Sequence, residues 1–379
     1  MNQTPKAIQK ILFGSPGTGK SYKIREIAKE QLGITWDGES KVLKNTIKTV
    51  FHPEYTYADF MGKLLPLTQG NSVVYKFYPG HFLQILGMAY RGLIDETDEH
   101  YLLVIDELNR GNASAIFGTA FQLLDRESDD WSSYEIDISE MELVGLLSSM
   151  SYKPKVDNDG TIQVRYNKTD YPVEVFLDDK IKKPDGETNK NQSRLISLLK
   201  QRKISIPSNL SILATINTSD ESIYYLDSAF KRRWDWEYID SPNGENFTIE
   251  NIPDGIGNVK LIINEDSLDW YICVIGLNEL IKSNSKFIRR IEDKQVGWWF
   301  VKPENGQIDL QKIKDKVMFY LWDSVFSRDK RPLESALAEA PGKKDIKLIT
   351  YADFVACTEE LMIYAYSSAL ELYPDLDPP

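Results

Sequence analysis

The feature that most constrains the fold of this chain is a glycine-rich stretch close to its N-terminus, FGSPGTGKSY, residues 13–22. Its three glycines carry no Cβ, so the backbone can adopt positive φ angles and approach a bound group closely. The spacing G-x-x-x-x-G-K-S is typical of a phosphate loop, in which backbone N–H groups surround a phosphate and a lysine adds a positive charge. The residues of this pattern are Gly14, Ser15, Pro16, Gly17, Thr18, Gly19, Lys20 and Ser21.

The sequence on either side of the loop fits this interpretation. Residues 7–13, AIQKILF, are typical of a strand, and apolar residues then recur at helical spacing until Gly33. Strand, loop and helix in this order are the context that a phosphate loop requires, because the N-terminal end of the helix attracts the anion. A glycine-rich surface turn that matches the pattern by chance is the alternative.

Composition limits the classes of protein to consider. The 379 residues are 42% hydrophobic and 27% charged, as in ordinary globular proteins, and 45 Lys and Arg against 57 Asp and Glu give a net charge of −12. This balance argues against binding nucleic acid through the whole surface and leaves only a local basic strip. Two distant cysteines and three histidines give no disulfide framework or zinc pattern. Without an apolar run of membrane-spanning length or a secretion signal, we expect a cytoplasmic protein with no membrane partner.

A second motif ends the apolar run YLLVIDELNRG, residues 101–111, with the adjacent carboxylates Asp106 and Glu107. The run predicts a buried parallel strand that presents both acids at its carboxyl end. In a phosphate-loop enzyme the first acid, Asp106, holds Mg²⁺ together with the Ser21 hydroxyl, and the second, Glu107, polarises the attacking water. A core strand that simply ends in solvated acids is the alternative.

A third motif lies in residues 206–234, where the strand LSILATI is followed by Asn217. A strand placed between the two motif strands would bring Asn217 beside the γ-phosphate, where it could orient the lytic water. Asp220 and Ser222 are candidate caps of the next helix, which closes with Lys231, Arg232 and Arg233. Ring NTPases use such arginines to reach the phosphate bound by a neighbouring subunit. The alternative is that these cations only stabilise the dipole of their own helix.

Taken together, these motifs resemble the McrB branch of the AAA+ superfamily, the nucleotide-driven ring motors of modification-dependent restriction systems. The resemblance spans nearly the whole chain and includes FHPEYTYADFMG, YPGHF, LVIDELNRGNASAIFG and LDSAFKRRW. NTSDES, residues 217–222, is close to the hallmark Asn-Thr-Ala-Asp-Arg-Ser of the branch, and QVGWWFV, residues 295–301, is similar to part of the family's lid.

The resemblance implies a role for each motif residue. Lys20 and Ser21 would bind phosphate and Mg²⁺, Asp106 and Glu107 would form the second acidic motif, and Asn217 would be the first sensor. Arg232 and Arg233 would be the candidates for action on a neighbouring subunit. It also implies a hexameric homo-oligomer, GTP in preference to the ATP of most AAA+ relatives, and a nuclease partner of the McrC type. Because Glu221 replaces the hallmark arginine and Trp298 replaces histidine, the sensor-loop charge pattern and the lid contact are not carried over.

The predicted architecture is α/β. Residues 1–240 form an AAA+ P-loop NTPase core, a parallel sheet flanked by helices, and residues 241–379 form a helical lid. Residues 128–203 are an insertion that contains β-hairpin alternation and the chain's basic island. This insertion could line the pore of a ring and grip DNA or a partner, with a solvated loop as the alternative. Trp298, Trp299 and Phe300 are assigned to lid packing, with a subunit contact as the other option.

Three functional hypotheses follow from these features. The first is an NTPase that hydrolyses GTP or ATP with Mg²⁺ and drives a nuclease subunit in defence against foreign DNA, with DNA reached through the partner or the insertion. The alternative is a remodelling chaperone of the MoxR type, another AAA+ ATPase. A switch that binds nucleotide without turnover is disfavoured, because it does not need the second acid Glu107.

Overall fold

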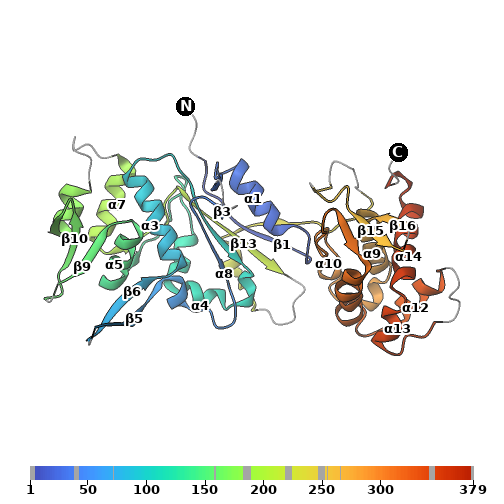
Figure 1. Cartoon of the computed structure of the whole chain (residues 1–379). Helices are drawn as coiled ribbons and strands as arrows, with labels where there is room; N and C mark the ends of the chain where they lie inside the picture. The colour runs from blue at the N-terminus through green and yellow to red at the C-terminus, as the bar shows by residue number, and fades with distance from the viewer. Residues whose placement is uncertain are drawn as a thin grey trace. The chain divides into compact units, whose positions relative to one another are not determined.

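A computed structural model of the chain describes residues 5–376 except 38–41, 71, 158, 182–188, 218–223, 246–251, 254, 265 and 341–345. The chain forms two compact units (Figure 1). The first takes in the chain up to Leu12, Ser21–Ile216 and the stretch that ends at Glu237. The second takes in Phe13–Lys20, Asn217 and the chain from Tyr238 onward, so most of the phosphate loop groups with the C-terminal residues.

A five-stranded sheet in the order β14-β1-β13-β7-β4 forms the centre of the first unit. Strand β7 pairs in parallel with both β13 and β4. Nearly every residue of β7 and β13 is buried, as expected for parallel strands covered by helices on both faces. The strands are β1 (Gln9–Gly14), β4 (Thr46–Val50), β7 (Tyr101–Asp106), β13 (Leu210–Asn217) and β14 (Asp235–Tyr238). The helices around them are α1 (Lys20–Glu30), α3 (His81–Ile94), α4 (Ala113–Phe117) and α8 (Ser228–Lys231), and a small ribbon joins β2 (Trp36–Asp37) to β3 (Val42–Leu43).

A β-hairpin that the sequence analysis does not predict lies between α2 (Tyr57–Phe60) and α3. Its strands β5 (Gly62–Gln69) and β6 (Ser72–Pro79) pair antiparallel along their whole length. The base is firmly held, because Gly80 N donates to Met61 O at 2.9 Å and Tyr55 Oη lies 2.7 Å from His81 Nδ1. The two strands of the hairpin expose large apolar side chains, namely Leu64, Leu65, Leu67, Val73, Val74, Tyr75 and Tyr78.

Within residues 128–203, the part that the structure describes is folded and contains the expected hairpin. Strands β9 (Lys153–Val156), β10 (Ile162–Tyr166) and β11 (Thr169–Pro172) form an antiparallel sheet. Two helices that were not predicted, α5 (Glu140–Ser149) and α7 (Lys190–Lys200), bury apolar faces beside it. The remaining elements are β8 (Ile136–Asp137), α6 (Val173–Val175) and β12 (Lys203–Ile204).

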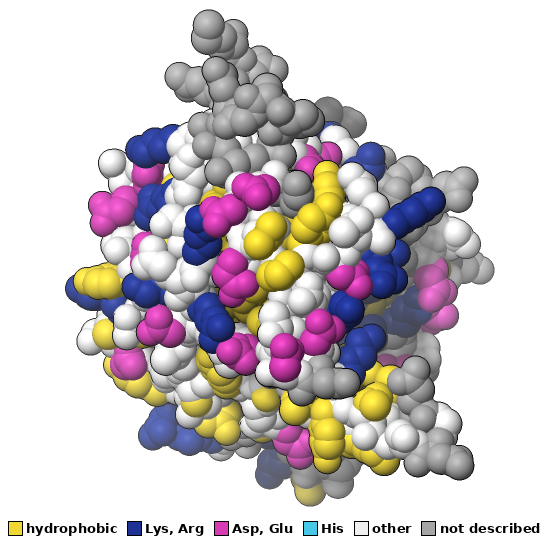
Figure 2. All heavy atoms as spheres, turned by 90° about the vertical axis from the view of Figure 1, so that its left-hand side faces the viewer, with side chains coloured by type: hydrophobic (Ala, Val, Ile, Leu, Met, Phe, Trp, Pro, Cys, Tyr) yellow, Lys and Arg dark blue, Asp and Glu magenta, His cyan; other side chains and the backbone are white. Residues whose placement is uncertain are grey.

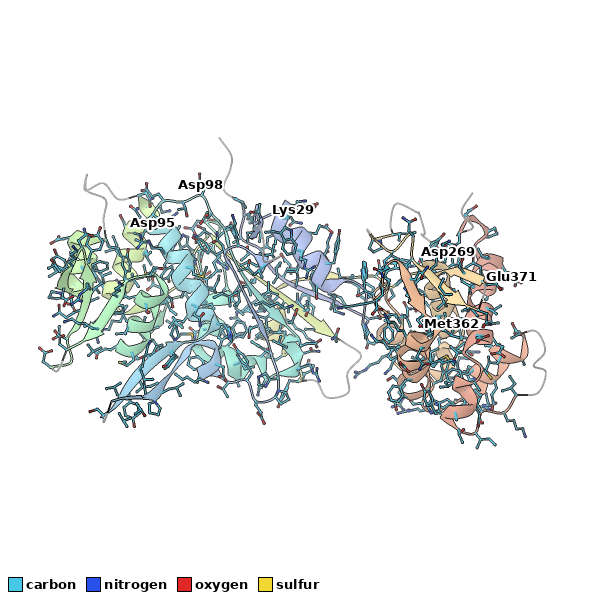
Figure 3. The ribbon with its side chains drawn as sticks, viewed as in Figure 1. Lys29, Asp95, Asp98, Asp269, Met362 and Glu371 are labelled. Carbon is cyan, nitrogen blue, oxygen red and sulfur yellow. The ribbon has the colours of Figure 1, made fainter. Side chains whose placement is uncertain are left out.

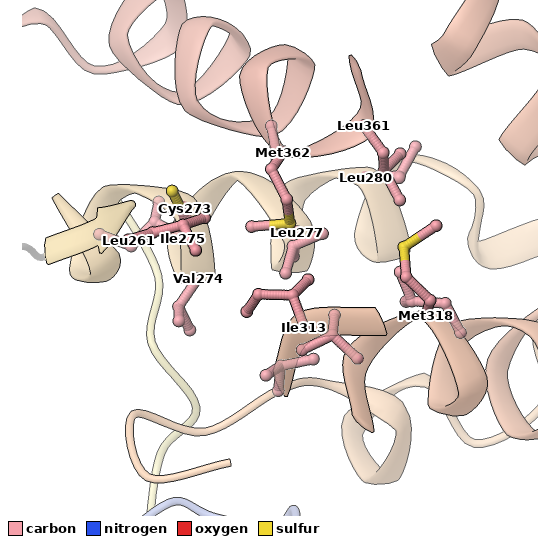
Figure 4. Packing of buried hydrophobic residues seen from close by; sticks show 14 of the residues in the cluster. Leu261, Cys273, Val274, Ile275, Leu277, Leu280, Ile313, Met318, Leu361 and Met362 are labelled. Carbon is pink, nitrogen blue, oxygen red and sulfur yellow. The ribbon is translucent and has the colours of Figure 1, made fainter. Parts of the chain in front are cut away.

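The second unit is mainly helical, as predicted, but it also contains a three-stranded sheet in the order β16-β15-β17. Its core packs α9 (Trp270–Ser283) against α14 (Thr358–Leu372), with Cys273, Leu277 and Met362 among the buried side chains (Figure 4). Residues 350–372 contain two helices, α13 (Tyr351–Val355) and α14. The other elements are β15 (Lys260–Ile263), β16 (Asp266–Asp269), α10 (Ile291–Lys294), β17 (Gln307–Asp309), α11 (Leu310–Lys312), π-helical turns at Ile313–Met318 and Leu321–Val325, and α12 (Arg331–Ala338).

Candidate nucleotide site

The phosphate loop has the backbone conformation that its glycines predict. Gly14, Gly17 and Gly19 have φ angles of 150°, 79° and 98°, a region that other residues rarely adopt. At Gly14 a Cβ would also lie 2.5 Å from Ile239 O, so close approach excludes a side chain there. The loop follows β1 directly and leads into α1, in the predicted order.

Lys20, the lysine of the motif, is only 9% exposed. Its ammonium group donates to Gly14 O at 2.8 Å and to Ser15 O at 2.9 Å, so it is held over the loop rather than extended into solvent. Thr18 Oγ1 also donates to Ser15 O, at 3.0 Å. A desolvated cation at the N-terminal end of a helix is suited to neutralise a phosphate.

Within the second unit, a segment that is remote in sequence lies on the phosphate loop. The sequence analysis does not predict this contact. This segment, residues 295–300, is called the strap below. Gly297 N donates to Pro16 O at 3.1 Å, and Trp299 N donates to Gly17 O at 2.9 Å. A Cβ on Gly297 would lie 2.1 Å from Gly17 C, so the two backbones pack directly against each other. Just before the strap, Glu292 O accepts a hydrogen bond from Ser15 Oγ.

The acidic pair lies where β7 ends. Glu107 follows the strand with φ 54° and ψ 44°, a left-handed conformation that is uncommon outside glycine. Thr215 on the neighbouring strand β13 holds the turn, because its Oγ1 accepts from Glu107 N at 3.2 Å and donates to Asp106 Oδ1 at 3.1 Å. Lys48 forms an ion pair with Asp106 Oδ2. Sequence reasoning missed both Thr215 and Lys48, although Thr215 lies two residues before Asn217 on a recognised strand.

The Asp106 carboxylate suits a divalent cation. It is an oxygen ligand of the kind that Mg²⁺ prefers and it is largely buried. In this structure its positive partner is the ammonium group of Lys48, whose place the cation would take. Asn217 ends β13 beside β7, and the parallel register brings Ala214 opposite Ile105. Asn217, the last residue of β13, therefore lies at the same edge of the sheet as Asp106 and Glu107.

The two candidate arginines have different surroundings. Arg233 forms an ion pair with Asp125 at 2.7 Å, lies 4.1 Å above the ring of Phe121, and has a side chain that is 9% exposed. Arg232 is exposed at the end of α8. The predicted caps Asp220 and Ser222 lie outside the described residues, and α8 is capped by Asp227, which accepts from Phe230 N at 2.7 Å.

The basic island of the insertion is largely neutralised where the structure describes it. Arg202 pairs with Glu140 at 2.7 Å, and Lys200 pairs with Asp178. Lys190 and Arg194 approach Asp129, and Lys203 approaches Glu135. On the face shown in Figure 2, cationic and anionic side chains are interspersed. Lys182 and Lys183 lie outside the described residues. The described part of the island favours a solvated, ion-paired surface over a strip for a phosphate backbone.

A phosphate-loop motif after one strand of a parallel sheet, with polar groups after the next two strands, is the arrangement of the AAA+ P-loop fold that the sequence predicts. No protein-family model matches the chain. It is 26% identical over 343 residues to the type II restriction enzyme BsuMI component YdiS of Bacillus subtilis, covering 84% of this chain and 80% of that protein.

A second relative is the type IV methyl-directed restriction enzyme EcoKMcrB subunit of Escherichia coli, which is 22% identical over 245 residues. That match covers 63% of this chain and 38% of the subunit. The similarity to these two restriction components supports the resemblance to McrB-type proteins that the motifs carry. The solved structure of PCH-2 from C. elegans overlaps 96% of this chain and 62% of that one, with 12% identity and a TM-score of 0.22. Among the described residues, no helix is both long and apolar enough to cross a membrane.

Proposed function

We propose that this protein is the nucleoside-triphosphatase motor of a restriction system, working with a partner nuclease subunit against foreign DNA. The observation that carries the proposal is the order of the central sheet. The strand that leads into the phosphate loop, the strand that ends at Asn217 and the strand that ends at Asp106 are consecutive neighbours. The restriction components among its relatives support the biological setting.

Each site residue has a defined task in this proposal. The amides of residues 14–19 and the Lys20 ammonium group would neutralise the triphosphate. Ser21 and Asp106 would hold Mg²⁺, which supplies charge stabilisation between the β- and γ-phosphates. Glu107 would accept the proton of the attacking water, and Asn217 would orient that water.

A neighbouring copy would complete the site in a homo-oligomeric ring. Arg232 is the better candidate for action on that copy, because it is exposed while Arg233 is paired with Asp125 of its own chain. A guanidinium group beside the γ-phosphate would stabilise the charge that develops during hydrolysis. Because the described basic groups of the insertion are ion-paired, we assign DNA contact to the partner subunit rather than to this segment.

Phosphate release with GTP and with ATP tests the proposal. Lys20→Ala should abolish nucleotide binding, and Glu107→Gln should bind nucleotide but lose turnover by about 100-fold or more, because it removes only the proton acceptor. Lys29→Ala, an exposed lysine of the same helix α1 (Figure 3), is the matched control and should behave as wild type.

The nucleotide preference and the partner separate the two functional classes. Preference for GTP, together with stimulation by a co-encoded nuclease subunit, would support the restriction motor. Preference for ATP, without any effect of such a subunit, would favour the MoxR-type chaperone. If neither nucleotide is bound by the wild type at millimolar concentration, the NTPase proposal is wrong.

A further inference from the structure

The strap has an internal anchor that fixes its position in the second unit. Asn278 on α9 is fully buried. Its Oδ1 accepts from Val296 N at 2.7 Å, and its Nδ2 donates to Val296 O at 2.9 Å and to Pro242 O at 2.8 Å. On the other side of Gly297, Trp298 O accepts from the indole N–H of Trp270 at 3.0 Å. The strap is therefore a rigid part of the helical core and not a loose loop.

This anchoring places the Trp299 indole against the phosphate loop. The Trp299 amide donates to Gly17 O, which fixes the backbone of this residue on the loop. The Cδ1 and Nε1 atoms of the ring lie 3.7 and 3.9 Å from the position that a Cβ on Gly19 would take. Gly19 immediately precedes Lys20, so the polar edge of the indole lies beside the backbone that the motif assigns to phosphate contact.

The chemistry of the indole fits an anionic ligand at this place. An indole N–H is a donor only, and it usually finds an acceptor when it is partly buried. Among the described residues, no acceptor is recorded for Trp299 Nε1, whereas Trp270 Nε1 in the same unit has Trp298 O. Trp299 is half-buried, and its ring also packs near Gly255.

We propose that Trp299 is a nucleotide-binding residue whose indole N–H donates to the phosphate chain, and that Asn278 is a positioning residue that holds the strap for this contact. The inference rests on the proposed nucleotide-binding function and adds to it a contact from the strap. Because Asn278 ties the strap to the helical core, the proposed contact would link bound phosphate to that core.

Equilibrium binding of a fluorescent N-methylanthraniloyl nucleotide tests this directly, because tryptophan close to the fluorophore transfers energy to it. Trp299→Phe keeps an aromatic ring and removes the N–H, so it should weaken binding by about tenfold, as expected for a hydrogen bond to a charged group. It should also lower the energy transfer measured at saturating nucleotide. The matched control is Trp322→Phe, because Trp322 packs on Phe354 and Tyr351 of the same unit and should keep both.

A second variant tests the position of the strap without changing the indole. Gly297→Ala would press a Cβ against Gly17 and should lower energy transfer as well. Unchanged affinity and unchanged energy transfer in Trp299→Phe would overturn this inference while leaving the NTPase proposal intact. Absence of nucleotide binding by the wild type would overturn both.

Discussion

Mild acid should destabilise the first unit through one buried histidine, His100, which is 3% exposed at the start of β7. Its Nε2 lies 2.8 Å from Ser211 Oγ, and that oxygen also accepts from Ile8 N at 2.8 Å. In an imidazolium both ring nitrogens are donors, so a charged His100 could not accept a hydrogen bond from Ser211. Among the described residues, His100 Nδ1 has no hydrogen-bond partner.

Burial lowers the pKa of His100 from 6.5 to about 4, and the charge of Arg126 contributes in the same direction. The folded state thus favours the neutral form. The associated stability is fully present above the unfolded pKa of 6.5 and is lost as the pH falls towards 4. Between pH 7 and pH 5 this one group should lower the free energy of unfolding by about 2 kcal/mol.

Urea unfolding at the two pH values, followed by far-UV circular dichroism, measures this change. His100→Gln should be less stable than wild type at pH 7, and its loss between pH 7 and pH 5 should be smaller by about the same 2 kcal/mol. His52→Gln, at an exposed position, is the control and should keep the wild-type dependence. Equal pH dependence in wild type and His100→Gln would refute the reasoning.

Three further predictions concern residues at or near the site. Arg233→Ala should lower the melting temperature because it breaks a largely buried ion pair. Arg232→Ala should leave the melting temperature unchanged and reduce only hydrolysis in the assembled protein. Equal melting curves for the two variants would contradict this prediction. Thr215→Val should keep nucleotide binding but slow phosphate release by about tenfold, because it frees the Asp106 and Glu107 turn; wild-type turnover would show that Thr215 is dispensable. Burial raises the pKa of the Cys273 thiol, so this thiol should react with a thiol reagent only as the protein unfolds. Rapid labelling of Cys273 in the native protein would contradict its burial.

Local patterns predicted the elements around the phosphate loop and the two motif strands. These patterns are short and contiguous, and their residue types carry the conformation directly, as the positive φ values of Gly14, Gly17 and Gly19 illustrate. The hairpin of β5 and β6 was missed although a signal existed, since Gly70 and Asn71 separate two apolar runs. The strand β16, residues 266–269, was not predicted, because its pairing with β15 leaves no local pattern in the sequence.

The strap could not be predicted because its contacts are remote in sequence. Ser15 and Glu292 are separated by 277 positions, and no periodicity links them. The two residues whose backbones meet in this contact are glycines, Gly17 and Gly297, and they have no side chains that could form a recognisable pattern. Asn278 looks like an ordinary polar residue of an amphipathic helix until the structure shows that all three of its hydrogen bonds go to backbone atoms.

The grouping of the phosphate loop with the C-terminal residues bears on how the chain can be divided for experiments. A fragment that stops near Asp240 would contain Lys20 and both acids, yet it would lack the donors of Gly297 and Trp299 that satisfy the Pro16 and Gly17 carbonyls. We therefore expect such a fragment to bind nucleotide poorly even when its sheet folds. Adding the missing piece, residues 241–379, as a separate polypeptide should restore binding, so this protein lends itself to fragment complementation.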